Sequence, residues 1–236
     1  EALISFSRTR LSTKLNLYNI VMELLKNKFT LAGSIIFLIA ILIVIIAIFS
    51  NNNGNSINNN EYASSGGVLL GNPDAPVTIV KFTDYQCPSC ASFTLGPAKQ
   101  IFREYVDTGK AKFIYRNYPF IGDESFQAAE AALCASDQNR LKEYDEIIYI
   151  NWNGQNKGTF SEKNLTTMAE LLQLNTNSFA ECMSSDKYIK NIQNDIDDGK
   201  KLGIKSTPSV LINGELIVGT KSYGDYRVII ERALGN

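Results

Sequence analysis

The most informative segment of the chain is Val77-Thr-Ile-Val-Lys-Phe-Thr-Asp-Tyr-Gln-Cys-Pro-Ser-Cys90, in which an apolar run is followed by two closely spaced cysteines. Its apolar, β-branched first half, Val77 to Phe82, predicts a strand, and the residues from Ser89 to Tyr105 predict a helix. Cys87 and Cys90 therefore lie where a strand turns into a helix. Such an order of elements is typical of an α/β fold.

Two thiols three positions apart at the start of a helix can close a reversible disulfide. The first turn of a helix offers unpaired N–H groups and the positive end of the helix dipole, and both favour a thiolate over a thiol. We therefore expect Cys87 to be the nucleophile, with a lowered pKa, and Cys90 to be the resolving thiol. Pro88 suits the first helical turn because no N–H donor is needed there.

A metal site or a permanent crosslink is the competing interpretation of this pair. A structural metal site usually needs four ligands, and the chain has no histidine. The other two cysteines, Cys134 and Cys182, do not form a second close pair. We therefore expect no metal and no other cofactor. The lack of histidine also excludes Ser-His and Cys-His nucleophilic sites.

Residues 29–49 carry no charge and are long enough to cross a bilayer as a helix, so they predict one transmembrane helix. Five basic residues precede this segment: Arg8, Arg10, Lys14, Lys26 and Lys28. By the positive-inside rule, residues 1–28 form a cytoplasmic N-terminal stub and the rest lies outside the cytoplasm. A cleavable signal peptide is the alternative, but Ala47-Ile-Phe-Ser50 is a poor cleavage site. We expect a single-pass signal anchor in the cell membrane.

Residues 50–66 are rich in Asn, Gly and Ser and predict a flexible linker, after which a folded domain occupies residues 67–236. The whole chain has a formal net charge of −1, and most of its acidic residues lie beyond the linker. This balance gives no electrostatic footprint for nucleic acid.

The folded domain has the expected order βαβ, then a helical block, then ββα. Helical patterns repeat through residues 123–203, with Gly and Asn at the breaks. The remaining elements are strands at Ala111–Arg116, Ser209–Ile212 and Glu215–Val218 and a helix at Tyr223–Leu234. Asn213-Gly214 predicts a two-residue hairpin turn between the last two strands.

Three motifs resemble those of DsbA-type thiol-disulfide oxidoreductases. They are Phe82-Thr-Asp-Tyr-Gln-Cys-Pro-Ser-Cys90, Ala129-Glu-Ala-Ala-Leu-Cys134 and Gly203-Ile-Lys-Ser-Thr-Pro-Ser-Val-Leu-Ile-Asn-Gly214. The resemblance covers residues 67–236 and implies a thioredoxin fold with an inserted α-helical domain at about 123–203. It also implies a dithiol oxidase for exported cysteine-containing polypeptides, with a membrane reoxidase of the DsbB or VKOR type as its partner.

The same resemblance implies that Thr207-Pro208 is a cis-proline loop that faces Cys87. The main chain of Thr207 would pair there with an extended substrate peptide. Pro88, Ser89, Thr207 and Pro208 are therefore the expected supporting residues of the active site. A trans proline at the start of a strand is the alternative for Pro208.

Lys81 departs from the family pattern, in which a buried acid commonly occupies this position and relays the proton of the resolving cysteine. A nearby ammonium would favour the Cys87 thiolate but cannot accept a proton while it is charged. The alternative is that Lys81 extends from the strand edge into solvent. Asp84 is the nearest acidic candidate for the relay.

Cys134 and Cys182 fall in the helical block, and an extracytoplasmic setting preserves disulfides. We therefore expect a structural Cys134–Cys182 bridge, with two buried free thiols as the alternative.

The direction of the chemistry depends on the reduction potential, which the residues alone do not give. A dithiol reductase or disulfide isomerase of the same fold is thus the first alternative to an oxidase. A metal-delivery or substrate-binding module is the second.

Overall fold

The structure is a computed structural model and describes residue 41 and residues 66–235. The predicted N-terminal stub, the transmembrane helix at 29–49 and the linker lie outside these residues, except for Ile41, which is helical, and Gly66. Among the described residues, no helix combines the length and apolarity that a bilayer span requires.

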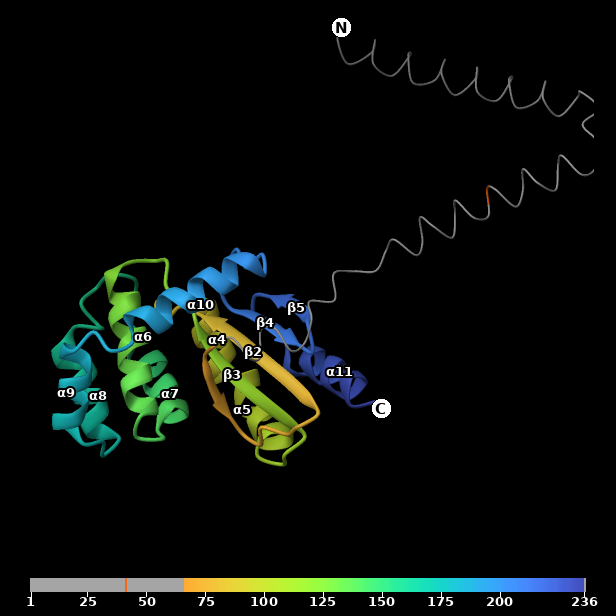
Figure 1. Cartoon of the computed structure of the whole chain (residues 1–236), viewed down its shortest axis with the longest axis horizontal. Coiled ribbons are helices and arrows are strands. Elements are labelled where there is room, and N and C mark those ends of the chain that lie inside the picture. The colour runs from red at the N-terminus through yellow and green to blue at the C-terminus, as the bar shows by residue number, and fades with distance from the viewer. Residues whose placement is uncertain (1–40, 42–65, 236) are drawn as a thin grey trace, which may run out of the picture. The chain divides into compact units, whose positions relative to one another are not determined.

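A five-stranded mixed sheet forms the centre of the folded domain (Figure 1), with strand order β1-β3-β2-β4-β5. The strands are β1 (Val68–Leu70), β2 (Val77–Thr83), β3 (Ala111–Asn117), β4 (Ser209–Ile212) and β5 (Glu215–Val218). β2 and β3 are parallel, and the other neighbouring pairs are antiparallel. Every residue of β2 is buried because helices cover both faces of the sheet.

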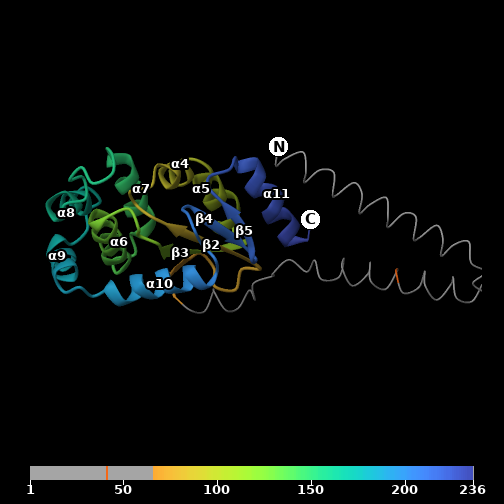
Figure 2. The ribbon, with the colours of Figure 1, turned by 90° about the horizontal axis from the view of Figure 1, so that it is seen from above.

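The redox helix lies on one face of this sheet together with the C-terminal helix. α4 (Pro88–Leu95), α5 (Pro97–Ile101), the π-helical turn η1 (Phe102–Val106) and α11 (Tyr223–Leu234) cover this face, whereas α10 (Ile189–Lys201) covers the other (Figure 2). Gly199 lets α10 approach closely, since a Cβ there would lie 2.6 Å from the ring of Tyr118. Arg116 at the end of β3 holds α10 through Asp195 and Asp198.

The helix expected from Ser89 to Tyr105 is interrupted. α4 ends at Leu95, and Gly96 adopts φ −111° and ψ −105°, outside the helical region. Pro97 causes this break because it cannot donate an N–H to the preceding turn and disfavours the α conformation of the residue before it. The Gly96-Pro97 signal was present in the sequence, and the prediction of one continuous helix was wrong.

Four helices form a bundle beside the sheet (Figure 1). They are α6 (Asp123–Ser136), α7 (Leu141–Asn151), α8 (Glu162–Leu171) and α9 (Thr176–Ser184). The predicted helical stretch at 123–203 therefore contains two parts, the bundle α6–α9 and the sheet-covering helix α10. The recurrence of apolar residues at helical spacing predicts that a segment is a helix. It does not predict which layer of the fold that helix joins.

The C-terminal elements match the sequence prediction. β4, β5 and α11 have the expected bounds. Asn213 (φ 43°) and Gly214 (φ 88°) form the hairpin turn with left-handed conformations, which is what a two-residue turn of this type requires. Strand β1 was not predicted, because three residues are too few for a period to be visible.

Candidate active site

Cys87 stands at the junction of strand and helix. β2 ends at Thr83, and Cys87 is the N-cap of α4, with extended backbone angles of φ −87° and ψ 119°. Its N–H donates to the carbonyl of Asp84 over 3.1 Å, which closes the short loop between the two elements. Pro88 begins the helix and faces solvent.

Both thiols are free, but they differ in access. Cys87 keeps 9% of its surface exposed, whereas Cys90, one turn further along α4, is fully buried. Of these two thiols, only Cys87 can meet a macromolecular thiol or disulfide without a rearrangement of the fold. The geometry thus distinguishes a partly accessible thiol from a fully buried one.

The two thiols also differ in acidity. A hydrogen bond from the Cys90 thiol, with smaller contributions from Thr207 and the N–H groups of Cys90 and Ser89, lowers the pKa of Cys87 to about 6 against the opposing effect of partial burial. Burial and the neighbouring Cys87 raise the pKa of Cys90 well above its ordinary value. The helix N–H groups anticipated from the sequence do contribute, but the Cys90 thiol contributes more.

The loop before β4 completes the site from 120 positions away. The Thr207–Pro208 peptide bond is cis, and the Cys87 thiol donates to the Thr207 carbonyl over 3.3 Å. Pro208 directly precedes β4, and its carbonyl accepts from Gly219, in the loop after β5. The structure therefore brings Thr207 and Pro208 next to the cysteine pair.

Ser89 is turned toward a different loop. Its hydroxyl lies 3.0 Å from the Thr220 hydroxyl, and its carbonyl accepts a hydrogen bond from the same group. The side chain of Ser89 thus ties α4 to the loop after β5, while its main-chain N–H supports the Cys87 thiolate.

Lys81 is buried, and the prediction that it might extend into solvent is wrong. Its exposed fraction is 1%, and its Nζ lies 3.0 Å from each carboxylate oxygen of Asp145 on α7. Nζ also donates to the Thr94 hydroxyl on α4 and lies 4.7 Å from the centre of the Tyr115 ring. An internal ammonium needs such partners because an isolated buried charge is very costly.

A buried carboxylate is therefore present beneath the redox helix, although it comes from α7 instead of β2. Asp145 is accompanied one turn later by Tyr149, whose hydroxyl lies 2.7 Å from the Thr83 hydroxyl. Hydrogen bonding from Thr83 in turn favours the Cys90 thiolate, against burial. A chain of polar groups thus runs from Tyr149 on α7, through the Thr83 hydroxyl, to Cys90.

Asp145 and Tyr149 are not among the site residues expected from the sequence, although one signal pointed to them. The buried face of α7 contains Leu141, Tyr144, Asp145, Ile148 and Tyr149. A carboxylate on an otherwise apolar helical face predicts a buried partner, but it does not identify Lys81.

Asp84 has a structural part in the site. One of its oxygens accepts from the Gln86 N–H and the Ser125 hydroxyl, and the other accepts from the N–H groups of Phe120 and Ile121. Four donors occupy this buried carboxylate and fix the loop that precedes Cys87.

Cys134 on α6 and Cys182 on α9 form a disulfide with a Cα–Cα distance of 5.8 Å. The bond lies within the helical bundle and joins two helices that are 48 positions apart in sequence.

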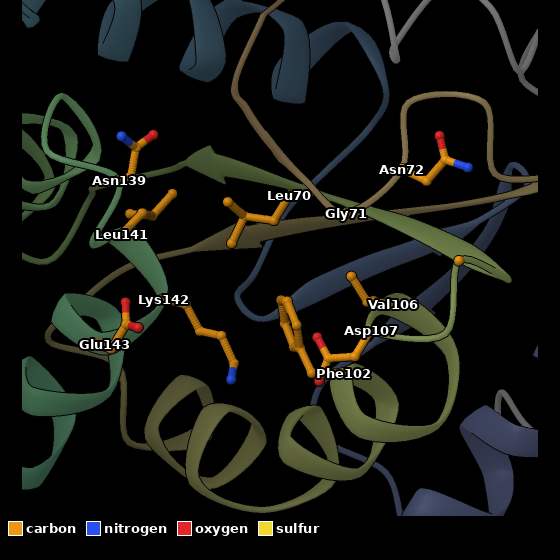
Figure 3. A pocket seen from close by; sticks show the side chains of 11 residues that line it. Leu70, Gly71, Asn72, Phe102, Val106, Asp107, Asn139, Leu141, Lys142 and Glu143 are labelled. Carbon is orange, nitrogen blue, oxygen red and sulfur yellow. The ribbon is translucent and has the colours of Figure 1, made fainter.

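A pocket of about 430 Å³ lies away from the cysteine pair, between the end of β1, the π-helical turn and the start of α7 (Figure 3). The Lys142 side chain extends toward Phe102 there, with its Nζ 5.1 Å from the ring centre. Neither redox cysteine lines this pocket. In residues 66–235, no three His, Cys, Asp or Glu side chains gather as metal ligands would.

Comparisons with known proteins agree with this geometry. A family model described as thioredoxin matches residues 63–232. Disulfide bond formation protein D of Bacillus subtilis is 27% identical over 172 residues, which are 72% of this chain and 78% of the relative. A probable disulfide bond formation protein D of Bacillus anthracis is 32% identical over 151 residues, which are 62% of this chain and 70% of the relative.

Solved structures show the same architecture. The crystal structure of oxidised BdbD from Bacillus subtilis superimposes with a TM-score of 0.66 at 26% identity, covering 72% of this chain and 94% of that one. The structure of α-DsbA1 from Wolbachia pipientis gives a TM-score of 0.63 at 25% identity, covering 71% and 90%. Because the family model covers most of the chain and these relatives share its fold, the chain belongs to the thioredoxin family, in its DsbA-type branch, and is a thiol-disulfide oxidoreductase.

Proposed function

We propose that this protein is a membrane-tethered dithiol oxidase that introduces disulfides into exported polypeptides outside the cytoplasm. The observation that carries the proposal is the opposite shift of the two thiols, with the pKa of Cys87 lowered to about 6 and that of Cys90 raised. Stabilising the Cys87 thiolate stabilises the reduced protein, which makes the Cys87–Cys90 disulfide a stronger oxidant.

The oxidation proceeds in two exchange steps. A substrate thiolate attacks the Cys87 sulfur of the Cys87–Cys90 disulfide, so a mixed disulfide forms and Cys90 leaves and takes up a proton. A second substrate thiolate then attacks the substrate sulfur of the mixed disulfide and releases Cys87 as a thiolate. The substrate loses two electrons and two protons overall, and the cysteine pair of the enzyme gains the two electrons.

The different pKa values of Cys87 and Cys90 favour oxidation of the substrate over its reduction. In the second step the leaving group is Cys87, and a thiol of low pKa leaves fast. A reductase would instead need Cys90 to attack the mixed disulfide as a thiolate, and burial opposes its ionisation. The pair is thus better suited to release a substrate with a new disulfide than to release a reduced substrate through attack of Cys90 on the mixed disulfide.

Substrate positioning is assigned to the loop at Thr207. Its carbonyl lies within hydrogen-bond distance of the Cys87 thiol, the more accessible of the two thiols. We assign to the main chain of Thr207 the pairing with an extended segment of an unfolded polypeptide, which places a substrate cysteine at Cys87. Pairing through the main chain tolerates many sequences, as an oxidase of exported proteins requires.

The tether and the electron acceptor complete the proposal. The uncharged segment 29–49, with basic residues before it, supports a membrane anchor that holds the catalytic domain outside the cytoplasm. The reduced pair would pass its electrons to a membrane reoxidase of the DsbB or VKOR type. The support for this partner is the family of the chain.

One experiment separates an oxidase from a reductase. The purified full-length chain is equilibrated with glutathione buffers, and the Cys87/Cys90 pair is quantified by alkylation and mass spectrometry. We expect a reduction potential above about −200 mV, in the range of oxidising members of the fold. A potential near that of thioredoxin, about −270 mV, would contradict the oxidase and favour the reductase.

The tether has its own test. Intact cells that express the chain are treated with a membrane-impermeant thiol reagent after mild reduction, and the protein is then followed in membrane and soluble fractions. We expect Cys87 to be labelled from outside and the chain to stay with the membrane at high salt. Deletion of residues 29–49 should release it, and a cytosolic, unlabelled full-length chain would contradict the anchor.

A further inference from the structure

The side chain of Gln86, the residue just before the nucleophile, is held by the helical insertion. Gln86 is fully buried, and its side-chain amide donates to the Ser125 hydroxyl over 3.0 Å and to Asn156 Oδ1 over 3.1 Å. Its side-chain carbonyl accepts from the Asn156 N–H. The amide of Gln86 thus has every donor and acceptor group occupied, and all the partners belong to the insertion.

The backbone conformation of Asn156 allows both its N–H and its side chain to contact Gln86. Asn156 has a left-handed φ of 52°, a conformation that Asn tolerates better than most residues. Both its N–H and its Oδ1 engage Gln86, in a reciprocal pair between residues 70 positions apart. Gly122 leaves the space for it, because a Cβ at Gly122 would lie 2.3 Å from Asn156 Oδ1.

The same contact extends to the main chain of the redox loop. The Gln86 N–H donates to Asp84, and its carbonyl accepts from the Gln155 side chain over 3.5 Å. Gln86 and Cys87 share a peptide bond, so the contacts of Gln86 fix the position of the main chain from which the Cys87 side chain extends. The sulfur has to stay at this position to receive hydrogen bonds from the N–H groups of Ser89 and Cys90.

We propose that Gln86 and Asn156 are positioning residues for Cys87, through which the loop between α7 and α8 holds the nucleophilic sulfur in place at the N-terminus of α4. This inference rests on the nucleophile role proposed for Cys87. Neither side chain needs to touch the substrate. The insertion, in this view, acts on the chemistry of the thioredoxin domain as well as covering its flank.

The test uses the reduced full-length chain and follows the Cys87 thiolate by its absorbance near 240 nm as the pH is varied. Gln86→Met keeps the shape of the side chain and removes its hydrogen bonds. Asn156→Gly removes only the side chain, because glycine accepts the left-handed conformation. Each change is expected to raise the pKa of Cys87 by at least about half a unit, which is a roughly threefold fall in the acid dissociation constant of the thiol.

Two further variants make the result specific. The double variant is expected to match the more affected single variant, since the two residues act as one pair. Gly122→Ala should raise the pKa in the same direction, because it pushes Asn156 away from Gln86 without altering either residue. If Gln86→Met does not fold, Asn156→Gly and Gly122→Ala carry the same test.

Gln138 provides a matched control. Its side chain pairs with the N–H and the carbonyl of Asn175 in the same reciprocal manner, at a position elsewhere in the insertion. Gln138→Met should leave the pKa of Cys87 unchanged. Gly224→Ala, where the nearest atom would be an ordinary 3.6 Å from the new Cβ, serves as the control for Gly122→Ala.

The outcomes separate this inference from the proposed function. Variants that melt at lower temperature but keep the pKa of Cys87 near 6 would show a merely structural contact and overturn the positioning role alone. A wild-type Cys87 that titrates near 9 would overturn the positioning role and the proposed function together. An equal shift in Gln138→Met would overturn the specificity of the Gln86–Asn156 pair.

Discussion

Lys81 of β2 and Asp145 of α7 form an ion pair in the interior, and both side chains are 1% exposed. The pair links the central strand of the sheet to the helical insertion directly beneath the redox helix, since Thr94 of α4 contacts both charges. Burial raises the pKa of Asp145, although Lys81 opposes that effect. Removing either partner leaves the other as an uncompensated charge.

We expect Asp145→Ala to destabilise the fold by about 3–5 kcal/mol, because the Lys81 ammonium would remain buried without its counter-charge. The double variant Lys81→Met/Asp145→Leu should recover most of this loss, since no unpaired charge is left. Urea unfolding of the reduced proteins measures both values. The matched control is Lys99–Glu146, a partly exposed pair that joins α5 to the same helix, α7.

Removing the Lys99–Glu146 pair by Lys99→Ala should cost no more than about 1 kcal/mol, because solvent screens a pair at the surface. Equal losses for Asp145→Ala and Lys99→Ala would show that burial does not amplify the Lys81–Asp145 interaction.

The reactivity of the Cys87 thiol toward an alkylating reagent should depend on pH. Alkylation of the reduced protein by iodoacetamide should rise with pH around a midpoint of about 6, as the Cys87 thiolate forms. Cys90 should react far more slowly across this range, because it is buried and its pKa is raised. Mass spectrometry assigns the modified residue. Cys87→Ser should abolish the step at pH 6, and a midpoint near 9 would argue against a stabilised thiolate.

Trapping of substrate follows from the two thiol roles. Cys90→Ser keeps the exposed Cys87 and removes the thiol that forms the internal disulfide. We expect this variant to accumulate mixed disulfides with reduced, unfolded polypeptides in the presence of an oxidant, visible as reductant-sensitive adducts in gel electrophoresis. Cys87→Ser is the control and should form none, so adducts of equal amount in both variants would contradict the assignment.

The same shift links stability to pH in the reduced protein. The pKa of Cys87 falls from an ordinary 9.0 to about 6 on folding, so the unfolded chain binds the extra proton between these values. Stability should therefore rise with pH from about 6 to about 9, at no more than about 1.4 kcal/mol per pH unit, and be lost as pH falls through 6. Urea midpoints of the reduced wild type and Cys87→Ser, compared at pH 6 and 8, test this slope.

Loss of the second disulfide should affect stability and leave the redox chemistry intact. The Cys134–Cys182 bond closes a loop of 48 positions, which the chain-entropy model equates with about 4 kcal/mol. In a background of Cys87→Ser/Cys90→Ser, the change Cys134→Ala/Cys182→Ala should lower the free energy of unfolding by up to this amount, measured by urea denaturation. With the redox pair restored, the pKa of Cys87 should stay near 6. A marked rise in that pKa would tie the bundle disulfide to catalysis.

Some elements could be predicted from the sequence because their determinants are local. The bounds of β4, β5 and α11 follow from short apolar runs, from the Asn213-Gly214 turn and from the polar residues around Ser222, which forms a capping box with Asp225. Cys87 at a helix start could likewise be read from a strand followed by Pro88. In each case, residues within one or two turns decide the conformation.

The partners of buried polar groups could not be predicted in this way. Lys81 lies 64 positions from Asp145, and Gln86 lies 70 positions from Asn156. No local period relates such residues, and the location of Lys81 in a strand was compatible with solvent exposure. Only the packing of α7 and its following loop against β2 and α4 brings these groups together.

The order of residues in the chain is enough to place two thiols together at a helix N-terminus, because helix geometry brings residues three positions apart onto adjacent turns. The N–H groups of Ser89 and Cys90 and the Cys90 thiol, which lower the pKa of Cys87, are part of the same local arrangement. Which thiol is accessible, how far burial raises the pKa of Cys90 and which charges lie beneath the pair depend instead on the tertiary structure. Such contacts form only when distant segments pack together.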